Sequence, residues 1–214
     1  MTEQSPAGTV AFRQMKDGTE GDYALLERLE ADFARRLPER VLDHLGRLAH
    51  SLSGYQVSRL EHSLQAATRA YRDGADVDWV VTALVHDIGD DLAPHNHDSL
   101  AAEVLKPYVR AECVWVARHH GIFQLVYYGD KIGADPHARE KYRDSPHFAA
   151  AAAFCERWDQ AAFDPDYDSL SLDDFAPLVR EVFSRSPWEP ARLDPEARGA
   201  QVDADTARAR AAAR

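Results

Sequence analysis

The sequence predicts an all-α protein. Along most of the chain, apolar residues recur at intervals of three and four, which is the spacing of one face of a helix. Prolines and glycines stand at the boundaries of these segments, where helices begin or end. Strand signals, in which apolar residues alternate between tight turns, are absent. A chain of 214 residues with 45% hydrophobic residues is long enough to bury a core of packed helices.

The boundary signals divide the chain into successive helices. Pro38 stands at a favourable first-turn position, Gly74 and Gly121 close two helices, and a break falls near Pro107. The segment that starts at Asp76 is unusually apolar inside, so we expect it to be the central helix of the core. A charged, tyrosine-rich connection follows over 125–147. We expect helices over 23–37, 38–52, 57–74, 76–89, 97–109, 110–121, 147–163 and 171–185.

Composition narrows the function classes. The chain has 25 Lys and Arg against 36 Asp and Glu, a net charge of −11, which disfavours nucleic acid and anionic membranes as partners. Its two cysteines, Cys113 and Cys155, form no Cys-x-x-Cys pair, so neither a disulfide framework nor a thiolate zinc site is expected. No segment reads as a membrane span or a signal peptide. We expect a cytoplasmic protein with a small-molecule partner and leave its oligomeric state open.

One folded domain is expected over 21–188. The segment 1–20 is polar and peripheral, and the Ala- and Arg-rich tail over 189–214 is expected to be a solvated helix or disordered.

Four of the ten histidines stand out, because each lies at or near a helix end beside apolar residues: His62, His86, His97 and His120. Imidazole is the commonest protein ligand for first-row metals. His44, His50, His137 and His147 lie in polar surroundings and are expected at the surface or in structural contacts.

Two aspartates accompany these histidines. Asp87 follows His86 at the end of the apolar run "LVHDIGDD", where burial is costly unless the carboxylate has a partner. Asp159 falls on an apolar stripe with Phe148, Ala152 and Cys155. A metal ion, or an arginine such as Arg69 or Arg118, would satisfy Asp159 equally well.

Taken together, these residues form an ordered H…HD…H…H…D series on separate helical segments, which resembles the HD-domain superfamily over about residues 10–188. The resemblance implies a single helical bundle with a dinuclear metal site in its core. His62, His86, Asp87 and Asp159 would hold one metal, and Asp87, His97 and His120 the other. His95 competes with His97, and His119 with His120; we prefer the second of each pair. Glu61, Asp90 and Asp91 are candidates to orient the ligand histidines.

The stretches "SGYQVSRLEHSLQAA", "LVHDIGDDL" and "FCERWDQAAF" resemble the oxygenase branch of that superfamily, which includes inositol oxygenase and the phosphonate-degrading oxygenases. The resemblance implies two Fe ions in a mixed-valent Fe(II)/Fe(III) pair, O2 as co-substrate and oxidation of a C–H bond. Two alternatives stay open. One is a phosphohydrolase that uses Mn, Co or Ni on a nucleotide or phosphate ester, and the other is a non-catalytic binding protein.

Five positions depart from the phosphonate oxygenases, and at three of them those enzymes hold their anionic substrate with His, Lys and Arg. Here these positions are Asp90, Gln124 and Glu156, and the Tyr and Glu that precede the first ligand are Leu52 and Tyr55. We therefore expect a small polar substrate other than a phosphonate, neutral or cationic, such as an amine.

The resemblance also guides which residues we expect at the substrate. Tyr55 and Gln124 are expected to line the pocket and to act beside Asp87 in catalysis, and Asp90 and Glu156 to disfavour anions. Arg157 completes the expected substrate site. If the departing positions face solvent, the anion site is instead supplied by Arg157, Lys141 or Arg143.

Overall fold

The computed structural model describes residues 8–189 and Arg210, so most of the predicted tail lies outside the described residues. Every regular element in this part is helical, which confirms the all-α prediction. The longer elements are α1 (Glu20–Arg35), α2 (Leu37–Arg47), α3 (Arg59–Arg72), α4 (Val77–Val85), α5 (His97–Leu105), α6 (Ala111–Tyr128), α7 (Phe148–Phe154) and α8 (Leu172–Phe183). Short 3-10 helices are η1 (Met15–Asp17), η2 (Leu48–His50), η3 (Gly129–Ile132) and η4 (Ala138–Tyr142), and a π-helical turn, η5 (Cys155–Asp159), directly follows α7.

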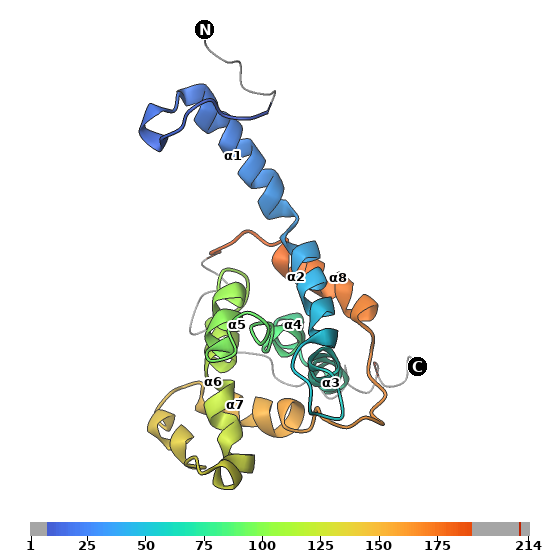
Figure 1. Cartoon of the computed structure of the whole chain (residues 1–214). Coiled ribbons are helices and arrows are strands. Elements are labelled where there is room, and N and C mark those ends of the chain that lie inside the picture. Colours follow the sequence, from blue (N-terminus) through green and yellow to red (C-terminus); the bar gives the residue numbers. More distant parts are fainter. Residues whose placement is uncertain (1–7, 190–209, 211–214) are drawn as a thin grey trace.

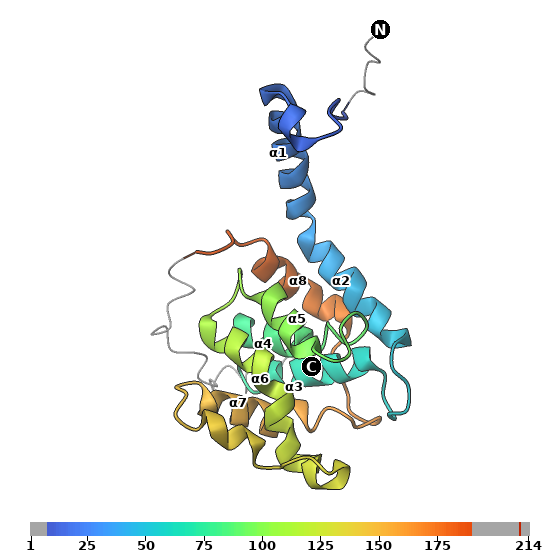
Figure 2. The same ribbon diagram turned by 60° about the vertical axis from the view of Figure 1, so that its left-hand side comes forward.

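Helix α4 lies in the centre of the bundle, as its apolar sequence predicted. Only Val77 among its residues is not buried. The helix contacts α3, α5, α6 and α8, which surround it in both views (Figures 1 and 2). Helix α1, in contrast, extends away from the bundle and has no buried residue (Figures 1 and 2). None of the helices in residues 8–189 combines the length and the apolar character needed to span a membrane.

Several helices end at residues other than those predicted from the sequence, and the ends of α6 and α4 bear on the site. Helix α6 does not stop at Gly121 but continues to Tyr128, because Phe123 on the added turns is fully buried in the core. Helix α4 stops at Val85 instead of running to Gly89. The chain then makes tight turns in which the N–H groups of Ile88 and Asp90 bond to the carbonyls of Val85 and Asp87.

Buried polar side chains of α3 fix the segment that follows η5. The amide of Gln65 donates to the carbonyl of Asp164 at 2.7 Å and accepts from the N–H of Asp164 at 3.2 Å. The hydroxyl of Thr68 accepts from the N–H of Leu170 at 3.0 Å. Because these contacts are buried or half-buried, they hold the end of η5 against α3 in one arrangement.

A buried ion cluster connects α4, α6 and α8. Asp78 is 4% exposed; it accepts from Arg185 at 2.6 Å and from the backbone N–H of Arg110 at 3.2 Å.

We expect Asp78→Ala to lower the free energy of unfolding by about 3 kcal/mol, because it leaves buried guanidinium groups short of a partner. Urea unfolding followed by circular dichroism measures this. Glu39→Ala is the matched control: Glu39 pairs with Arg180 between α2 and α8, but both side chains are about half exposed. A loss in Asp78→Ala no larger than in the control would contradict the role given to the cluster.

Candidate metal centre

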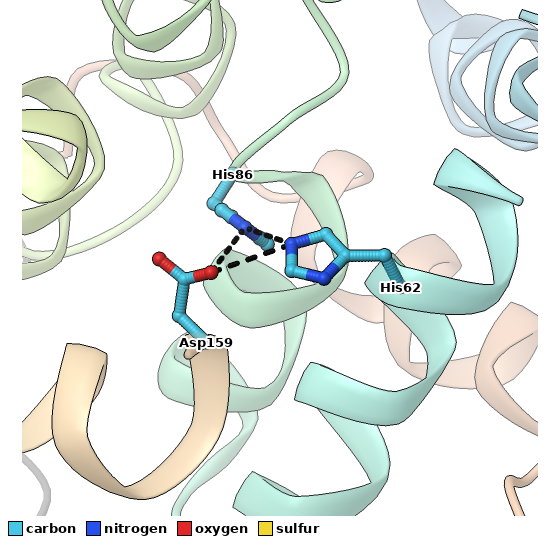
Figure 3. Close-up of side chains that lie close together, drawn as sticks. All are labelled: His62, His86 and Asp159. Carbon is cyan, nitrogen blue, oxygen red and sulfur yellow. Dashed lines mark hydrogen bonds and ion pairs between the residues drawn. The ribbon is translucent and has the colours of Figure 1, made fainter. Parts of the chain in front are cut away.

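Four buried side chains from three separated segments meet beside the end of α4. His62 comes from the second turn of α3, His86 and Asp87 directly follow α4, and Asp159 is the last residue of η5. Each of these residues is at most 2% exposed. Figure 3 shows His62, His86 and Asp159 pointing toward one common point.

The donor atoms in this first cluster have the separations of ligands around a single ion. Nε2 of His62 lies 3.1 Å from Nε2 of His86 and 3.3 Å from Oδ1 of Asp159. Nε2 of His86 lies 3.5 Å from the same carboxylate oxygen. Oδ2 of Asp87 closes the set, 3.2 Å from His62 and 3.3 Å from His86. Ligand atoms bound at about 2.1 Å from one metal lie about 3.0–3.4 Å apart, so the four donors fit one ion.

The hydrogen bonds of the rings leave Nε2 of both histidines available to bind a cation. Nδ1 of His62 faces the carbonyl of Ala162 at 3.0 Å, and Nδ1 of His86 faces the carbonyl of Ala83 at 2.7 Å. A carbonyl only accepts, so each Nδ1 carries the hydrogen and a neutral ring turns its Nε2 lone pair toward the cluster. Oδ2 of Asp159 is also buried without a hydrogen-bond partner in the described part of the chain. Facing lone pairs beside carboxylates are the arrangement of a metal site.

A second cluster shares Asp87 with the first. Oδ1 of Asp87 lies 3.3 Å from Nε2 of His97 and 3.1 Å from Nε2 of His120. Nδ1 of His120 faces the carbonyl of Ala117 at 2.7 Å, which again leaves Nε2 as the donor atom. His97, the first residue of α5, is the most exposed of these ligands, with 28% of its side chain accessible. Asp87 therefore has one carboxylate oxygen toward each cluster.

The sequence did not single out Arg59, which contacts the shared aspartate. Its Nη2 donates to Oδ2 of Asp87 and its Nε donates to Oδ2 of Asp90. Oδ1 of Asp90 lies 3.4 Å from Nδ1 of His97, so Asp90 connects Arg59 to a ligand histidine. The sequence could have placed Arg59 near the site, because Arg59 precedes His62 by three residues and so shares its helix face. The partners of Arg59, however, come from a distant segment.

A pocket of about 800 Å³ opens onto both clusters. Tyr55, Asp90 and Gln124 line it, as expected from the sequence. Tyr55 stacks against Phe163 at 5.2 Å between ring centroids, and Phe163 stacks against His62 at 4.4 Å. These rings form an aromatic wall from the pocket mouth to the first cluster. Leu52, another position that departs from the phosphonate oxygenases, also lines the pocket. Lining residues that the sequence did not single out include Tyr127, Tyr128 and Gln160.

Several expected residues lie elsewhere. Glu156 and Arg157 are exposed and do not line the pocket, and Arg157 instead pairs with Asp73 at 2.7 Å. Lys141 and Arg143 are also exposed and outside it. Of the other residues considered for the centre, His95 and Asp91 are exposed, and Glu61 bonds to Ser169. Arg118 pairs with Glu103 and does not satisfy Asp159.

The electrostatics of the first cluster predict how pH affects metal binding. Burial disfavours charge on the rings, yet Asp87 and Asp159 outweigh it and raise the pKa of His62 and, more strongly, of His86. Against the cost of burial, the charge of His86 in turn lowers the pKa of both aspartates. Without metal, the raised histidine pKa values stabilise the fold fully below about pH 6.5, and this contribution is lost as pH rises through them.

We therefore expect the increase in melting temperature caused by Mn²⁺ to grow between about pH 6 and pH 8, because metal must displace protons from the rings. Thermal unfolding with Mn²⁺ or with EDTA, at matched ionic strength, measures the difference. As pH rises, the metal-free protein loses the stabilisation that its imidazolium groups provide, while Mn²⁺ binds more tightly. Both effects should increase the difference in melting temperature between the Mn²⁺ and EDTA samples. A gap that narrows with rising pH would contradict this account.

His119 and His120 provide a second test, because the two adjacent residues face different surroundings. His119 stacks on Trp115 at 4.1 Å and its Nδ1 lies 2.7 Å from the carbonyl of Trp115, away from the donor clusters. We expect His120→Ala to reduce the metal content by one ion per chain and His119→Ala to leave it unchanged. Elemental analysis of the two purified variants decides this, and the reverse outcome would show that the wrong face of α6 had been assigned.

Comparison with known protein families agrees with this geometry. A model of the HD domain matches residues 59–213, well over half of the chain. The match includes the segments that supply all six proposed ligands. No curated protein matches the sequence.

Proposed function

The chain belongs to the HD-domain family, and from this membership and the buried His/Asp clusters of a metal-dependent enzyme we propose a dinuclear iron oxygenase. It would use O2 to oxidise a C–H bond next to a heteroatom of a small polar substrate. The proposed ligands are His62, His86, Asp87 and Asp159 for one ion, and Asp87, His97 and His120 for the other.

The composition of the second cluster carries the choice of an oxygenase. Two histidines and one carboxylate with open coordination positions are the set typical of non-haem Fe(II) oxygenases. His97 and His120 supply the nitrogens, Asp87 supplies the oxygen, and all three border the pocket. The first cluster has a carboxylate of its own, Asp159, in addition to the shared one. An extra anionic ligand favours a higher charge on the metal it binds, so unequal clusters support a mixed-valent pair.

Bound iron would supply the activation of O2 and the oxidation step. The protein's own residues would hold the ligands and the substrate. The carbonyls of Ala83, Ala117 and Ala162 fix the ring orientations of three ligand histidines. Gln124, buried at the pocket wall, offers an amide that can both donate to and accept from a polar substrate. Phe163 stacks on the ring of His62 and Tyr55 stacks on Phe163, so apolar rings cover one side of the first cluster.

Oxygen uptake tests the proposal directly. The protein is loaded with Fe(II) without air and its iron content is recorded. A one-electron oxidation with limiting ferricyanide then converts the Fe(II) pair to the mixed-valent state, whose EPR signal is recorded. O2 consumption is then followed with hydroxy, amino and phosphonate compounds. Two irons per chain and substrate-dependent O2 uptake are the expected result. Phosphate release from phosphate esters with Mn, Co or Ni, and no O2 uptake with any compound, would instead identify a phosphohydrolase. A folded protein that retains no metal would indicate a binding protein.

A further inference from the structure

We propose that Arg59 binds a carboxylate group of the substrate. This inference rests on the proposed function in that it names the substrate class of the same pocket. It replaces the expectation of a neutral or cationic substrate, which depended on Asp90 and Glu156 presenting negative charge to the pocket.

Arg59 is a buried cation with one side left for a ligand. The residue is 8% exposed, yet it borders the pocket. Its Nε and Nη2 donate to Asp90 and Asp87, whereas Nη1 makes no hydrogen bond within the described residues. Guanidinium has five N–H donors in a fixed plane, so the two aspartates set that plane and leave the Nη1 edge available.

The charge of the pocket changes sign when metal binds. Three carboxylates line it, from Asp87, Asp90 and Asp159, and Arg59 is the one Lys or Arg side chain that does so in the described part of the chain. These groups leave two net negative charges, and two divalent ions would reverse this to two positive charges. Glu156, which was expected to add a further negative charge, lies outside the pocket. The loaded pocket therefore attracts an anion.

The geometry favours a carboxylate over a phosphonate or a phosphate. One free guanidinium edge matches the two coplanar oxygens of a carboxylate. Apart from the metal ions, a tetrahedral dianion would find one cationic side chain for its three oxygens, because no other Lys or Arg in the described chain borders this pocket. The ring of Tyr55 lies beside the same guanidinium, 5.6 Å from ring centroid to Cζ, and continues into the aromatic wall. This wall would contact the carbon skeleton of a small carboxylic acid.

Calorimetric binding to Mn²⁺-loaded protein tests the inference. The probes are lactate, its neutral amide lactamide, and methylphosphonate, and the proteins are wild type, Arg59→Gln, Arg59→Lys and Arg157→Gln. We expect wild type to bind lactate more tightly than either other probe. Arg59→Gln should weaken the binding of lactate by about tenfold to a hundredfold, the range for a charged hydrogen bond. The affinity for lactamide should be unchanged. Arg59→Lys should lie between, because it keeps the charge and loses the planar edge.

Arg157→Gln is the matched control, because it removes the same charge from an exposed arginine outside the pocket. Metal content is measured for each variant; if Arg59→Gln loses Mn²⁺, Arg59→Lys takes its place. The inference is overturned if a metal-loaded Arg59 variant binds lactate as tightly as wild type does. It is also overturned if the variant loses affinity for lactate and for lactamide by the same factor. It is also overturned if wild type binds lactamide or methylphosphonate as tightly as lactate. No O2 is consumed in these measurements, so their outcome is separate from the test of oxygenase activity.

Discussion

Replacing Asp87 with alanine is expected to remove both metal ions. Oδ2 of Asp87 lies 3.2 Å from Nε2 of His62 in the first cluster, and Oδ1 lies 3.1 Å from Nε2 of His120 in the second. Among the six proposed ligands, Asp87 is the one assigned to both ions, with a separate carboxylate oxygen toward each cluster. Loss of a group that only orients a ligand already costs about 10–100-fold in metal affinity. Loss of a shared ligand should therefore cost more than about 100-fold at each site.

The fold should survive this change. Asp87 follows α4 and is not inside it, so alanine does not interrupt the helix. Arg59, which would lose one buried partner, keeps Asp90 as the other. Elemental analysis and circular dichroism of purified Asp87→Ala measure metal content and helix content together. Asp159→Ala is the control within the site, because it should lose only one ion, and Asp91→Ala, at an exposed position, should lose none. Two ions in folded Asp87→Ala would remove the dinuclear assignment.

The helical pattern of the sequence was sufficient for the all-α fold and for the burial of several ligand positions, whereas the expected convergence of the ligand series came from the resemblance to the HD-domain superfamily. Apolar neighbours marked His62, His86 and His120 as buried, and helix spacing placed Asp159 on an apolar face; all four are buried and near one another. These predictions succeeded because burial of a helix face is a local property of the sequence.

The predictions for the substrate residues depended on geometry that the sequence does not display. Glu156 lies three residues before Asp159, and in a regular α-helix it would share that face. The wider π turn of η5 rotates it to the surface instead. Asp90 does line the pocket, but its charge is offset by Arg59, 31 residues away in sequence. Local periodicity carries no information about such a distant pair.

Gly89, the last residue of the "HDIG" stretch, is expected to be essential for the second metal because of its contact with α5. A Cβ at position 89 would lie 2.6 Å from the carbonyl oxygen and 2.7 Å from Cα of His97. These are backbone atoms at the first turn of α5, so they cannot yield as the end of a flexible side chain can. Alanine would therefore push His97 away from Oδ1 of Asp87, which lies 3.3 Å from its Nε2.

We expect Gly89→Ala to lose the ion held by Asp87, His97 and His120 and to retain the other, and to destabilise the protein by about 1–3 kcal/mol, as overpacking of a core does. Elemental analysis gives the metal count, and urea unfolding of the metal-free protein gives the stability. Gly46→Ala is the matched control, since Gly46 lies inside α2 and a Cβ there meets no atom within 4 Å. That variant should keep both ions and be more stable by about 0.5–1 kcal/mol, because alanine favours a helix over glycine. If Gly89→Ala protein keeps two ions and unchanged stability, α5 can adjust without moving His97. The close approach of Gly89 to the backbone of His97 would then not explain why position 89 is a glycine.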